Sequence, residues 1–231
     1  MPKRILLAWS SGKDSAWALH MLGRRDDCEV MGLLTTFNQD AGRVNMHAVR
    51  RELVQAQAEA AGLPLWPVPL PSPCSNAEYE KRMGEVVERA KAEGLTHMAY
   101  GDLFLEDIRE YRVKRLAGSG IKPLFPIWSS PSETPELARR MLDEGLRAVI
   151  TCVDPQQLDA RFCGRLYDES LLADLPPGVD PCGERGEFHT FCFSGPMFDR
   201  QIAVRTGETV VHDGFSFTDV IAATSIGEAS P

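Results

Sequence analysis

Residues 10–15 combine the groups that proteins use to bind phosphate. They read Ser10-Ser11-Gly12-Lys13-Asp14-Ser15, between an apolar run at residues 5–9 and a helical pattern. Strand, loop and helix in this order present backbone N–H groups and the positive end of a helix dipole to an anion. An ordinary turn is the simpler explanation of such a string in a surface loop, but this position favours a phosphate site. It is not a Walker A loop, because Asp14 follows Gly12-Lys13.

Gly101 and Asp102 follow an apolar run at residues 96–100. A carboxylate at the end of a strand is well placed to hold a metal ion or a ribose. The helical stretch after it, residues 105–117, puts Arg109 and Arg112 on one face. A solvated, salt-bridged helix explains most of its charges, so Asp102 is the candidate we retain.

Residues 180–190 place Glu184 and Glu187 in a glycine-containing turn before an apolar strand. A turn requires glycine but not both glutamates, and paired carboxylates can orient an amine, bind ammonium or accept a proton. A charged hairpin is the alternative that the spacing leaves open. Cys182 and His189 lack any further ligand pattern, so we expect no metal site there.

The composition indicates a globular protein of one large or two small domains. The chain has 231 residues, of which 43% are hydrophobic and 25% charged, and a formal net charge of -8. This acidic balance argues against nucleic acid as a partner, and no apolar run is long enough to span a membrane. None of the six cysteines forms a Cys-x-x-Cys pair, so we expect reduced thiols in a cytoplasmic protein. A homodimer is left open.

Strands and helices alternate in the first half of the chain. Apolar patterns predict strands at residues 5–9, 29–37, 65–70 and 96–100, and helices at 16–24, 45–61, 76–92 and 105–117. This order predicts an α/β fold with a doubly wound parallel sheet and right-handed crossovers. Prolines in residues 65–70 indicate an edge or near-edge strand. Ligands bind such sheets at the carboxyl ends of the strands, where residues 10–15, Thr35 and Gly101-Asp102 fall.

The second half has a different pattern. A proline-rich segment at residues 123–135 predicts a domain boundary, which we place between residues 122 and 123. A helix at 134–144 and a strand at 147–153 follow, and the sequence does not decide to which domain they belong. Beyond residue 158, short alternating runs predict antiparallel strands and a smaller α+β domain. We expect the small polar residues after 223 to fray.

Residues 10–15 resemble the PP-loop, Ser-Gly-Gly-x-Asp-Ser, of the N-type ATP pyrophosphatases, which adenylate a substrate. The sequence departs from that pattern at Ser11, where the family usually has glycine. With residues 45–50, 101–112 and 183–190, the loop resembles the diphthine–ammonia ligase family. That family has a Gly-Asp-x-x-x-x-Asp-x-Arg-type segment and a Gly-Glu-x-Gly-Glu-Phe/Tyr-x-Thr signature. The resemblance covers nearly the whole chain.

The resemblance implies an adenine nucleotide alpha-hydrolase-like, Rossmann-like ATP-binding domain at residues 1–122 and a substrate-binding domain at 123–231. It implies an ATP-dependent ligase in which ATP activates a carboxylate, pyrophosphate leaves, and ammonia displaces AMP. The implied catalytic residues are Lys13, Asp14, Glu184 and Glu187. The implied nucleotide-binding residues are Ser10, Ser11, Gly12, Lys13, Asp14, Ser15, Thr35, Gly101 and Asp102, with Asp14 and Asp102 holding Mg²⁺.

The resemblance leaves the acceptor open. The family's named substrate in eukaryotes and archaea is the modified histidine of elongation factor 2, in diphthamide synthesis, and a small carboxylic acid is the other option. Two further functions compete with the ligase. A tRNA-modifying PP-loop enzyme commonly has paired cysteines and basic regions, which this sequence lacks. An ATP or AMP sensor binds nucleotide without releasing pyrophosphate.

Overall fold

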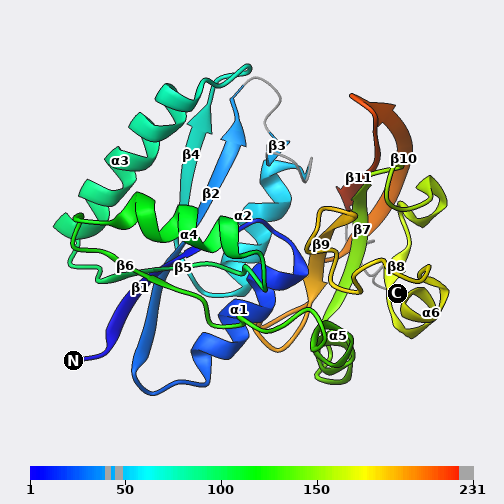
Figure 1. Ribbon diagram of the computed structural model, residues 1–231, viewed down its shortest axis with the longest axis horizontal. Helices are drawn as coiled ribbons and strands as arrows, with labels where there is room; N and C mark the ends of the chain where they lie inside the picture. Colours follow the sequence, from blue (N-terminus) through cyan, green and yellow to red (C-terminus); the bar gives the residue numbers. More distant parts are fainter. Residues whose placement is uncertain (40–42, 45–48, 224–231) are drawn as a thin grey trace, which may run out of the picture.

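The structure is a computed structural model that describes residues 1–39, 43–44 and 49–223. Two sheets lie side by side, one in each lobe of the molecule (Figure 1). The first sheet is parallel except for one short strand, and helices cover both of its faces. The predicted α/β class is therefore confirmed, with a second, smaller sheet domain.

The first sheet has β1 in a central position, with β2 on one side and β5 on the other. β4 pairs with β2 in parallel, β6 pairs with β5 in parallel, and β3 runs antiparallel to the end of β2. The strands are β1 (Lys3–Ala8), β2 (Cys28–Asn38), β3 (Arg43–Val44), β4 (Leu65–Leu70), β5 (His97–Ala99) and β6 (Lys122–Leu124). Since Leu7 pairs with both Leu33 and Ala99, the carboxyl ends of β1, β2 and β5 are adjacent.

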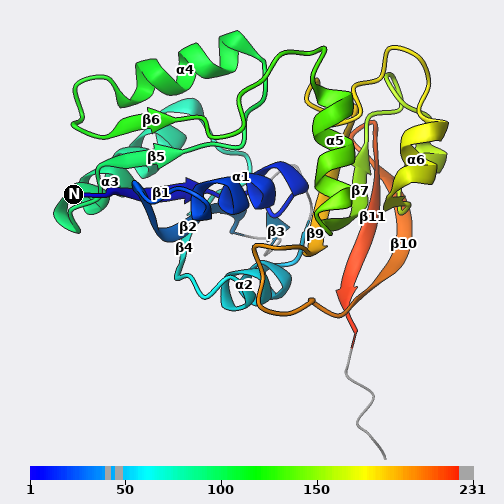
Figure 2. The same cartoon turned by 90° about the horizontal axis from the view of Figure 1, so that it is seen from below.

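Within the described residues, four helices complete the first lobe. They are α1 (Lys13–Gly23), α2 (Arg51–Ala60), α3 (Asn76–Ala92) and α4 (Glu106–Leu116). Alternate residues of β1 face opposite sides: Ile5 and Leu7 join one apolar cluster with Trp17 of α1, and Leu6 joins another with Val86 of α3. Figure 2 shows α2 and α4 on opposite faces of this sheet. None of the helices within the described residues is both long and apolar enough to span a bilayer.

Two details of the first lobe differ from the sequence prediction, and a third agrees with it. α2 begins at Arg51, later than residue 45, and residues 45–48 lie outside the described residues. β6 lies within the proline-rich segment, and its pairing with β5 adds Pro123 and Leu124 to the first sheet. The edge position predicted for residues 65–70 is confirmed, since β2 is the strand that pairs with β4 and Pro67 and Pro69 are exposed.

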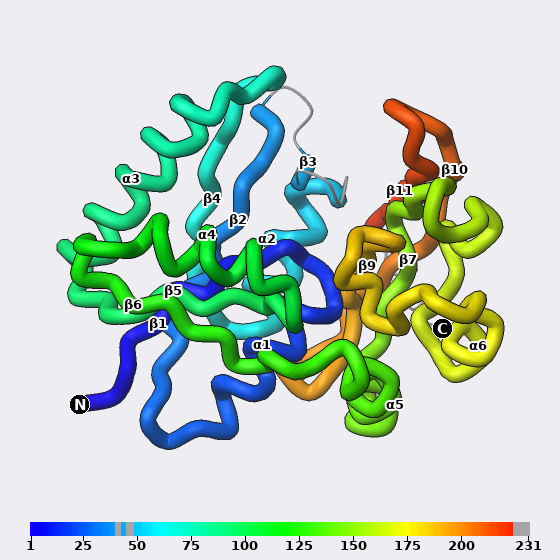
Figure 3. The backbone as a smooth tube through the Cα atoms, viewed as in Figure 1, coloured from blue at the N-terminus to red at the C-terminus, as the bar shows by residue number. Residues whose placement is uncertain are grey.

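The second lobe is an antiparallel sheet around β7. β7 pairs with β8, β9 and β11, and β10 pairs with β11. Its elements are α5 (Thr134–Asp143), β7 (Arg147–Val153), a 3-10 turn (Ala160–Phe162), β8 (Leu166–Tyr167), α6 (Glu169–Asp174), β9 (Phe188–Ser194), β10 (Val204–His212) and β11 (Phe215–Ala222). The strand at 147–153, left unassigned from the sequence, is thus the centre of the second sheet. Figure 3 traces the chain from β6 across to α5.

The two lobes share one apolar cluster. It runs from Leu7 and Trp17 in the first lobe to Val149, Phe188 and Phe191 in the second. α1 contacts β9 directly, and the backbone N–H of Cys192 in β9 donates to the carbonyl of Ser11 at 2.9 Å. The second sheet is therefore packed against the loop that follows β1.

Candidate active site

A pocket of about 810 Å³ lies at the carboxyl ends of β1, β2 and β5. Its position agrees with the rule that ligands bind open α/β sheets where the strand order reverses, here between β1 and β5. Residues from the loop after β1, from α3 and α4, and from residues 183–190 of the second lobe contribute to its lining. The predicted site residues among them are Ser10, Lys13, Asp14, Ser15, Gly101, Asp102 and Glu184. The structure thus brings together three segments that are far apart in sequence.

Buried hydrogen bonds fix the backbone of the loop after β1 at Ser11. Ser11 is fully buried and has a φ of 72°, in the left-handed region, which costs a residue other than glycine about 1–2 kcal/mol. This explains why glycine suits the position. The Ser11 hydroxyl has no hydrogen-bond partner among the described residues. Its carbonyl accepts from Cys192 and from the side-chain Nε2 of Gln57 at 2.9 Å.

The other loop residues form a hydrogen-bonded turn at the start of α1. The hydroxyls of Ser10 and Ser15 lie 3.1 Å apart, and Ser15 also donates to the Gly12 carbonyl at 3.0 Å. The Gly12 N–H donates to Ser10 Oγ at 3.3 Å, and the Lys13 N–H donates to Thr190 Oγ1 at 3.0 Å. Small polar groups therefore surround the amino end of α1, as an anion site requires.

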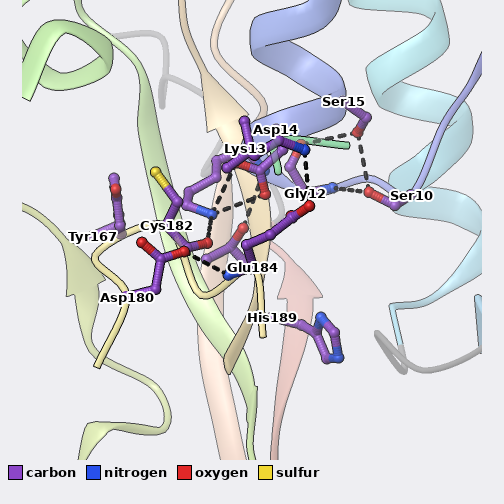
Figure 4. A network of polar contacts seen from close by, with 12 residues as sticks. Ser10, Gly12, Lys13, Asp14, Ser15, Tyr167, Asp180, Cys182, Glu184 and His189 are labelled. Carbon is purple, nitrogen blue, oxygen red and sulfur yellow. Dashed lines mark hydrogen bonds and ion pairs between the residues drawn. The ribbon is translucent and has the colours of Figure 1, made fainter. Parts of the chain in front are cut away.

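Lys13 extends from α1 toward the second lobe (Figure 4). Its ammonium lies 2.9 Å from Asp14 Oδ2, also donates to the Cys182 carbonyl, and faces the rings of Tyr167 and Phe188 at 5.5 and 5.4 Å. Burial lowers the pKa of this ammonium, but the Asp14 carboxylate together with Cys182 and Asp180 outweighs burial, and the pKa is raised. Lys13 therefore stays charged and joins the loop to the second lobe.

Gly101 and Thr35 contact the backbone on either side of the loop after β1. A Cβ on Gly101 would lie 2.9 Å from the Asp14 carbonyl carbon, so glycine permits the end of β5 to pack closely against α1. The buried Thr35 hydroxyl donates to the Trp9 carbonyl at 2.8 Å, and Thr35 is not among the lining residues. Thr36, the next residue of β2, lines the pocket instead.

Asp102 lies in the pocket beside a cation from α4. Its Oδ2 is 3.4 Å from Nε of Arg112, whose guanidinium stacks 4.7 Å from the ring centre of Tyr100. Burial raises the pKa of Asp102, and Arg112 opposes that rise. The helical face predicted for Arg112 thus turns toward the site.

Glu184 crosses from the second lobe to the first. Its Oε1 accepts the backbone N–H of Leu103 at 2.8 Å, and within the described part of the chain no Lys, Arg or His forms an ion pair with it. Burial, together with the nearby carboxylates of Asp14 and Asp102, raises the pKa of Glu184 to about 7. At neutral pH Glu184 can therefore both accept and release a proton.

Glu187 is placed differently and supports the turn itself. It is 2% exposed, and its carboxylate accepts the backbone N–H groups of Asp180 at 2.9 Å and Arg185 at 3.0 Å. Gly183 has a φ of 67°, and a Cβ there would lie 2.8 Å from the Phe188 carbonyl oxygen. Glu187 and Gly183 thus shape the turn that presents Glu184.

Several lining residues were not singled out from the sequence. Tyr79, Met83 and Val87 of α3 and Tyr111 of α4 form an apolar wall away from the second lobe. His189 also lines the pocket, and burial lowers its pKa to about 4, which keeps the ring neutral. Figure 4 shows this ring turned away from the network around Lys13. Helical spacing revealed the apolar face of α3, whereas α4 was predicted as a charged helix, and the sequence did not show which part of either helix meets a ligand.

The residues predicted to bind Mg²⁺ supply two carboxylates, which is not a complete set of ligands for the ion. Among the described residues, no three His, Cys, Asp or Glu side chains cluster in a way that could hold a metal ion. Asp14 and Asp102 both line the pocket and are 25% and 18% exposed. Mg²⁺ is commonly held by one or two carboxylates together with phosphates and water, so this donor set fits a metal that arrives with a nucleotide.

Two family models match most of the chain. The family model described as diphthamide synthase N-terminal domain matches residues 3–123, and the one described as diphthamide synthase C-terminal domain matches residues 133–226. The chain belongs to the diphthamide synthase family. The segment 45–50 that contributed to the resemblance falls largely outside the described residues.

Curated relatives carry the name diphthine–ammonia ligase. The protein from Homo sapiens is 31% identical over 141 residues, which cover 58% of this chain and 51% of the human protein. The one from Bos taurus is 28% identical over 191 residues, covering 74% and 69%, and the one from Rattus norvegicus is 30% identical over 141 residues. The chain spans about half the length of the human and rat relatives.

Proposed function

We propose that this protein is an ATP-dependent, amide-forming ligase of the diphthine–ammonia ligase type. A carboxylate of the acceptor attacks the α-phosphorus of ATP, which releases pyrophosphate and leaves an acyl-adenylate. Ammonia then attacks the acyl carbon, AMP leaves, and an amide remains. The observation that carries the proposal is the pocket in which the loop after β1 and residues 183–190 of the second lobe face each other.

The triphosphate is assigned to the amino end of α1. Ser10, Ser15 and the N–H of Gly12 supply hydrogen-bond donors there. Asp14 and Asp102 would hold Mg²⁺, which shields phosphate charge when it is bound. Lys13 acts through its ion pair with Asp14 and its bond to the second lobe. Ser11, Thr35 and Gly101 act on the nucleotide through the backbone that they shape.

The rest of the pocket suggests an orientation for the ligands. The wall formed by Tyr79, Met83 and Val87 lies away from the second lobe and suits the adenine ring. This arrangement turns the α-phosphorus toward the acceptor. We assign residues 1–122 to ATP binding and 123–231 to acceptor binding, with Pro123 and Leu124 still contributing to the first sheet.

Glu184 is assigned to ammonia. It faces the pocket without a cationic partner among the described residues, which suits a carboxylate that binds ammonium and takes one of its protons. Ammonium plus the ionised Glu184 gives ammonia plus the protonated Glu184. Glu187 contributes by holding the turn through its hydrogen bonds to Asp180 and Arg185.

Pyrophosphate release tests the proposal. The protein is incubated with ATP, Mg²⁺ and ammonium, together with either elongation factor 2 carrying the carboxylate-bearing modified histidine or a panel of small carboxylic acids. We expect pyrophosphate and AMP in equal amounts with one of these acceptors. Tight ATP binding without pyrophosphate from any of them would favour a nucleotide sensor and overturn the ligase.

A further inference from the structure

Gln57 is a polar side chain on the buried face of α2. Gln57 is 0% exposed, and all of its hydrogen-bonding groups face protein. Its Nε2 donates to the carbonyls of Ser11 at 2.9 Å and Cys192 at 2.6 Å, and its Oε1 accepts from Nε1 of Trp9 at 2.8 Å. One amide thus joins the end of β1, the loop after it, and β9 of the second lobe.

These contacts fix the direction of one peptide group. In a trans peptide the carbonyl of one residue and the N–H of the next point in opposite directions. Gln57 and the N–H of Cys192 hold the Ser11 carbonyl toward the protein interior. The N–H of Gly12 is therefore held on the opposite side, where it reaches Ser10 Oγ in the lining of the pocket.

The same contacts hold Ser11 in an unfavourable conformation. Serine at a φ of 72° returns readily to negative φ unless its neighbours prevent it, whereas glycine would adopt either sign. If the Ser11 peptide rotated, its carbonyl oxygen would move toward the position of an incoming phosphate. A fully buried amide with two donors aimed at two carbonyls is the feature that opposes this rotation.

We propose that Gln57 is the positioning residue of the phosphate loop: it holds the Ser11–Gly12 peptide so that the Gly12 N–H faces the phosphates of the nucleotide. This inference rests on the proposed function in assigning phosphate to the loop. Gln57 does not touch the ligand, and it acts through Ser11. Its effect should therefore appear with phosphate-bearing ligands and be absent for the nucleoside.

The test compares ATP and adenosine binding in Gln57→Glu, Gln57→Met and the matched control Gln55→Glu. Gln55 is an exposed glutamine on the same helix that pairs with Glu59. At pH 8 we expect Gln57→Met to bind ATP at least tenfold more weakly, because methionine offers no donor to the two carbonyl oxygens. Adenosine affinity should change less than twofold, and Gln55→Glu should match the wild type for both ligands.

The pH profile separates positioning from general damage. A protonated carboxyl regains one donor, and burial raises the pKa of such a carboxyl, so ATP affinity of Gln57→Glu should recover as the pH falls from 9.5 to 5.5, whereas that of Gln57→Met should stay low throughout. If Gln57→Glu does not fold at pH 8, Gln57→Met carries the comparison. Equal loss of ATP and adenosine, no loss of ATP, or no recovery at low pH would overturn the inference.

A readout without nucleotide keeps this inference separate from the proposed ligase activity. Amide hydrogen exchange of Gly12 in the ligand-free protein should be at least tenfold faster in Gln57→Met than in the wild type or Gln55→Glu. Unchanged exchange would count against the positioning role even if the protein releases pyrophosphate. If exchange is faster but the protein releases no pyrophosphate, the positioning role of Gln57 is supported and the ligase assignment alone is contradicted.

Discussion

The loop after β1 and the turn at residues 183–190 meet at the pocket, yet they hold their charges differently. In the loop, Lys13 and Asp14 lie 2.9 Å apart and neutralise each other. In the turn, backbone N–H groups satisfy Glu187, whereas Glu184 has a single backbone partner and no ion pair within the described residues. The loop is thus charge-balanced and fixed, and the turn presents a carboxylate whose ionisation changes near neutral pH.

The largest effect should come from Glu184→Gln. If Glu184 takes the proton of ammonium, amide formation should fall by about 10²–10⁴-fold, while ATP–pyrophosphate exchange through the acyl-adenylate changes little. In the wild type, amide formation at saturating ammonium should rise to a plateau above about pH 7, because the raised pKa keeps Glu184 protonated below that point, whereas a reaction limited by free ammonia would keep rising with pH. Glu88→Gln, which changes an exposed lining carboxylate of α3 that pairs with Lys91, is the control. A plateau retained at the same pH in Glu184→Gln would assign the titration elsewhere.

Lys13→Ala tests the loop after β1, where Lys13 and Asp14 neutralise each other. It should reduce adenylation by about a hundredfold or more, because Asp14 loses its cation and the loop loses its bond to the Cys182 carbonyl. Breaking a buried pair also costs about 3–5 kcal/mol of unfolding free energy. Pyrophosphate release and urea unfolding measure the two effects, with the exposed Lys91→Ala as control. Untouched turnover would show that the loop does not serve adenylation.

Gly183→Ala and Gly178→Ala sharpen the comparison on the side of the turn. Both glycines have positive φ, so each alanine should cost about 1–2 kcal/mol of unfolding free energy. Nothing lies within 4 Å of a Cβ on Gly178, whereas one on Gly183 meets the Phe188 carbonyl at 2.8 Å, which should add about 1–3 kcal/mol. Urea unfolding measures the difference. Equal costs would mean that the turn shifts freely.

The smallest effect should come from Asp219→Asn. This substitution weakens a contact between the lobes that lies outside the loop after β1 and the turn at residues 183–190. Asp219 pairs with Arg43 at 2.9 Å and Arg50 at 2.6 Å, and all three side chains are partly exposed. The loss should be at most about 1 kcal/mol and should shrink at high salt. Because hydrogen bonding to Arg50 lowers the pKa of Asp219, its stabilisation is present at neutral pH and is lost in acid. Thermal unfolding in low and high salt checks this, and ATP affinity should not change.

The sequence predicted the first sheet well because its strands and helices are long and periodic. α3, and in the second lobe β7, were predicted with the observed bounds, since glycine follows α3 and an apolar run defines β7. β6 was missed because a three-residue edge strand containing Pro123 has no apolar pattern of its own. In β2, neighbouring side chains face opposite sides, and the sequence does not show that Thr36 rather than Thr35 lines the pocket.

The site was only partly predictable for a different reason. The motifs identified the segments, but Glu184 and Glu187 look alike until the fold turns one to the pocket and the other to the backbone. Gln57 did leave a signal, because it lies four residues after Leu53 on the apolar stripe of α2. A polar residue in such a stripe is expected to be buried with hydrogen-bond partners. The partners of Gln57 come from distant parts of the chain, so the sequence does not identify them.

The apolar cluster that joins Trp17 to Phe191 has a consequence for how the molecule unfolds. Cutting the chain near residue 122 would leave each half with a bare hydrophobic surface, so neither fragment should express as a folded species. The intact chain should instead melt in a single calorimetric transition. A compound lodged between the lobes would then raise the melting temperature of both together.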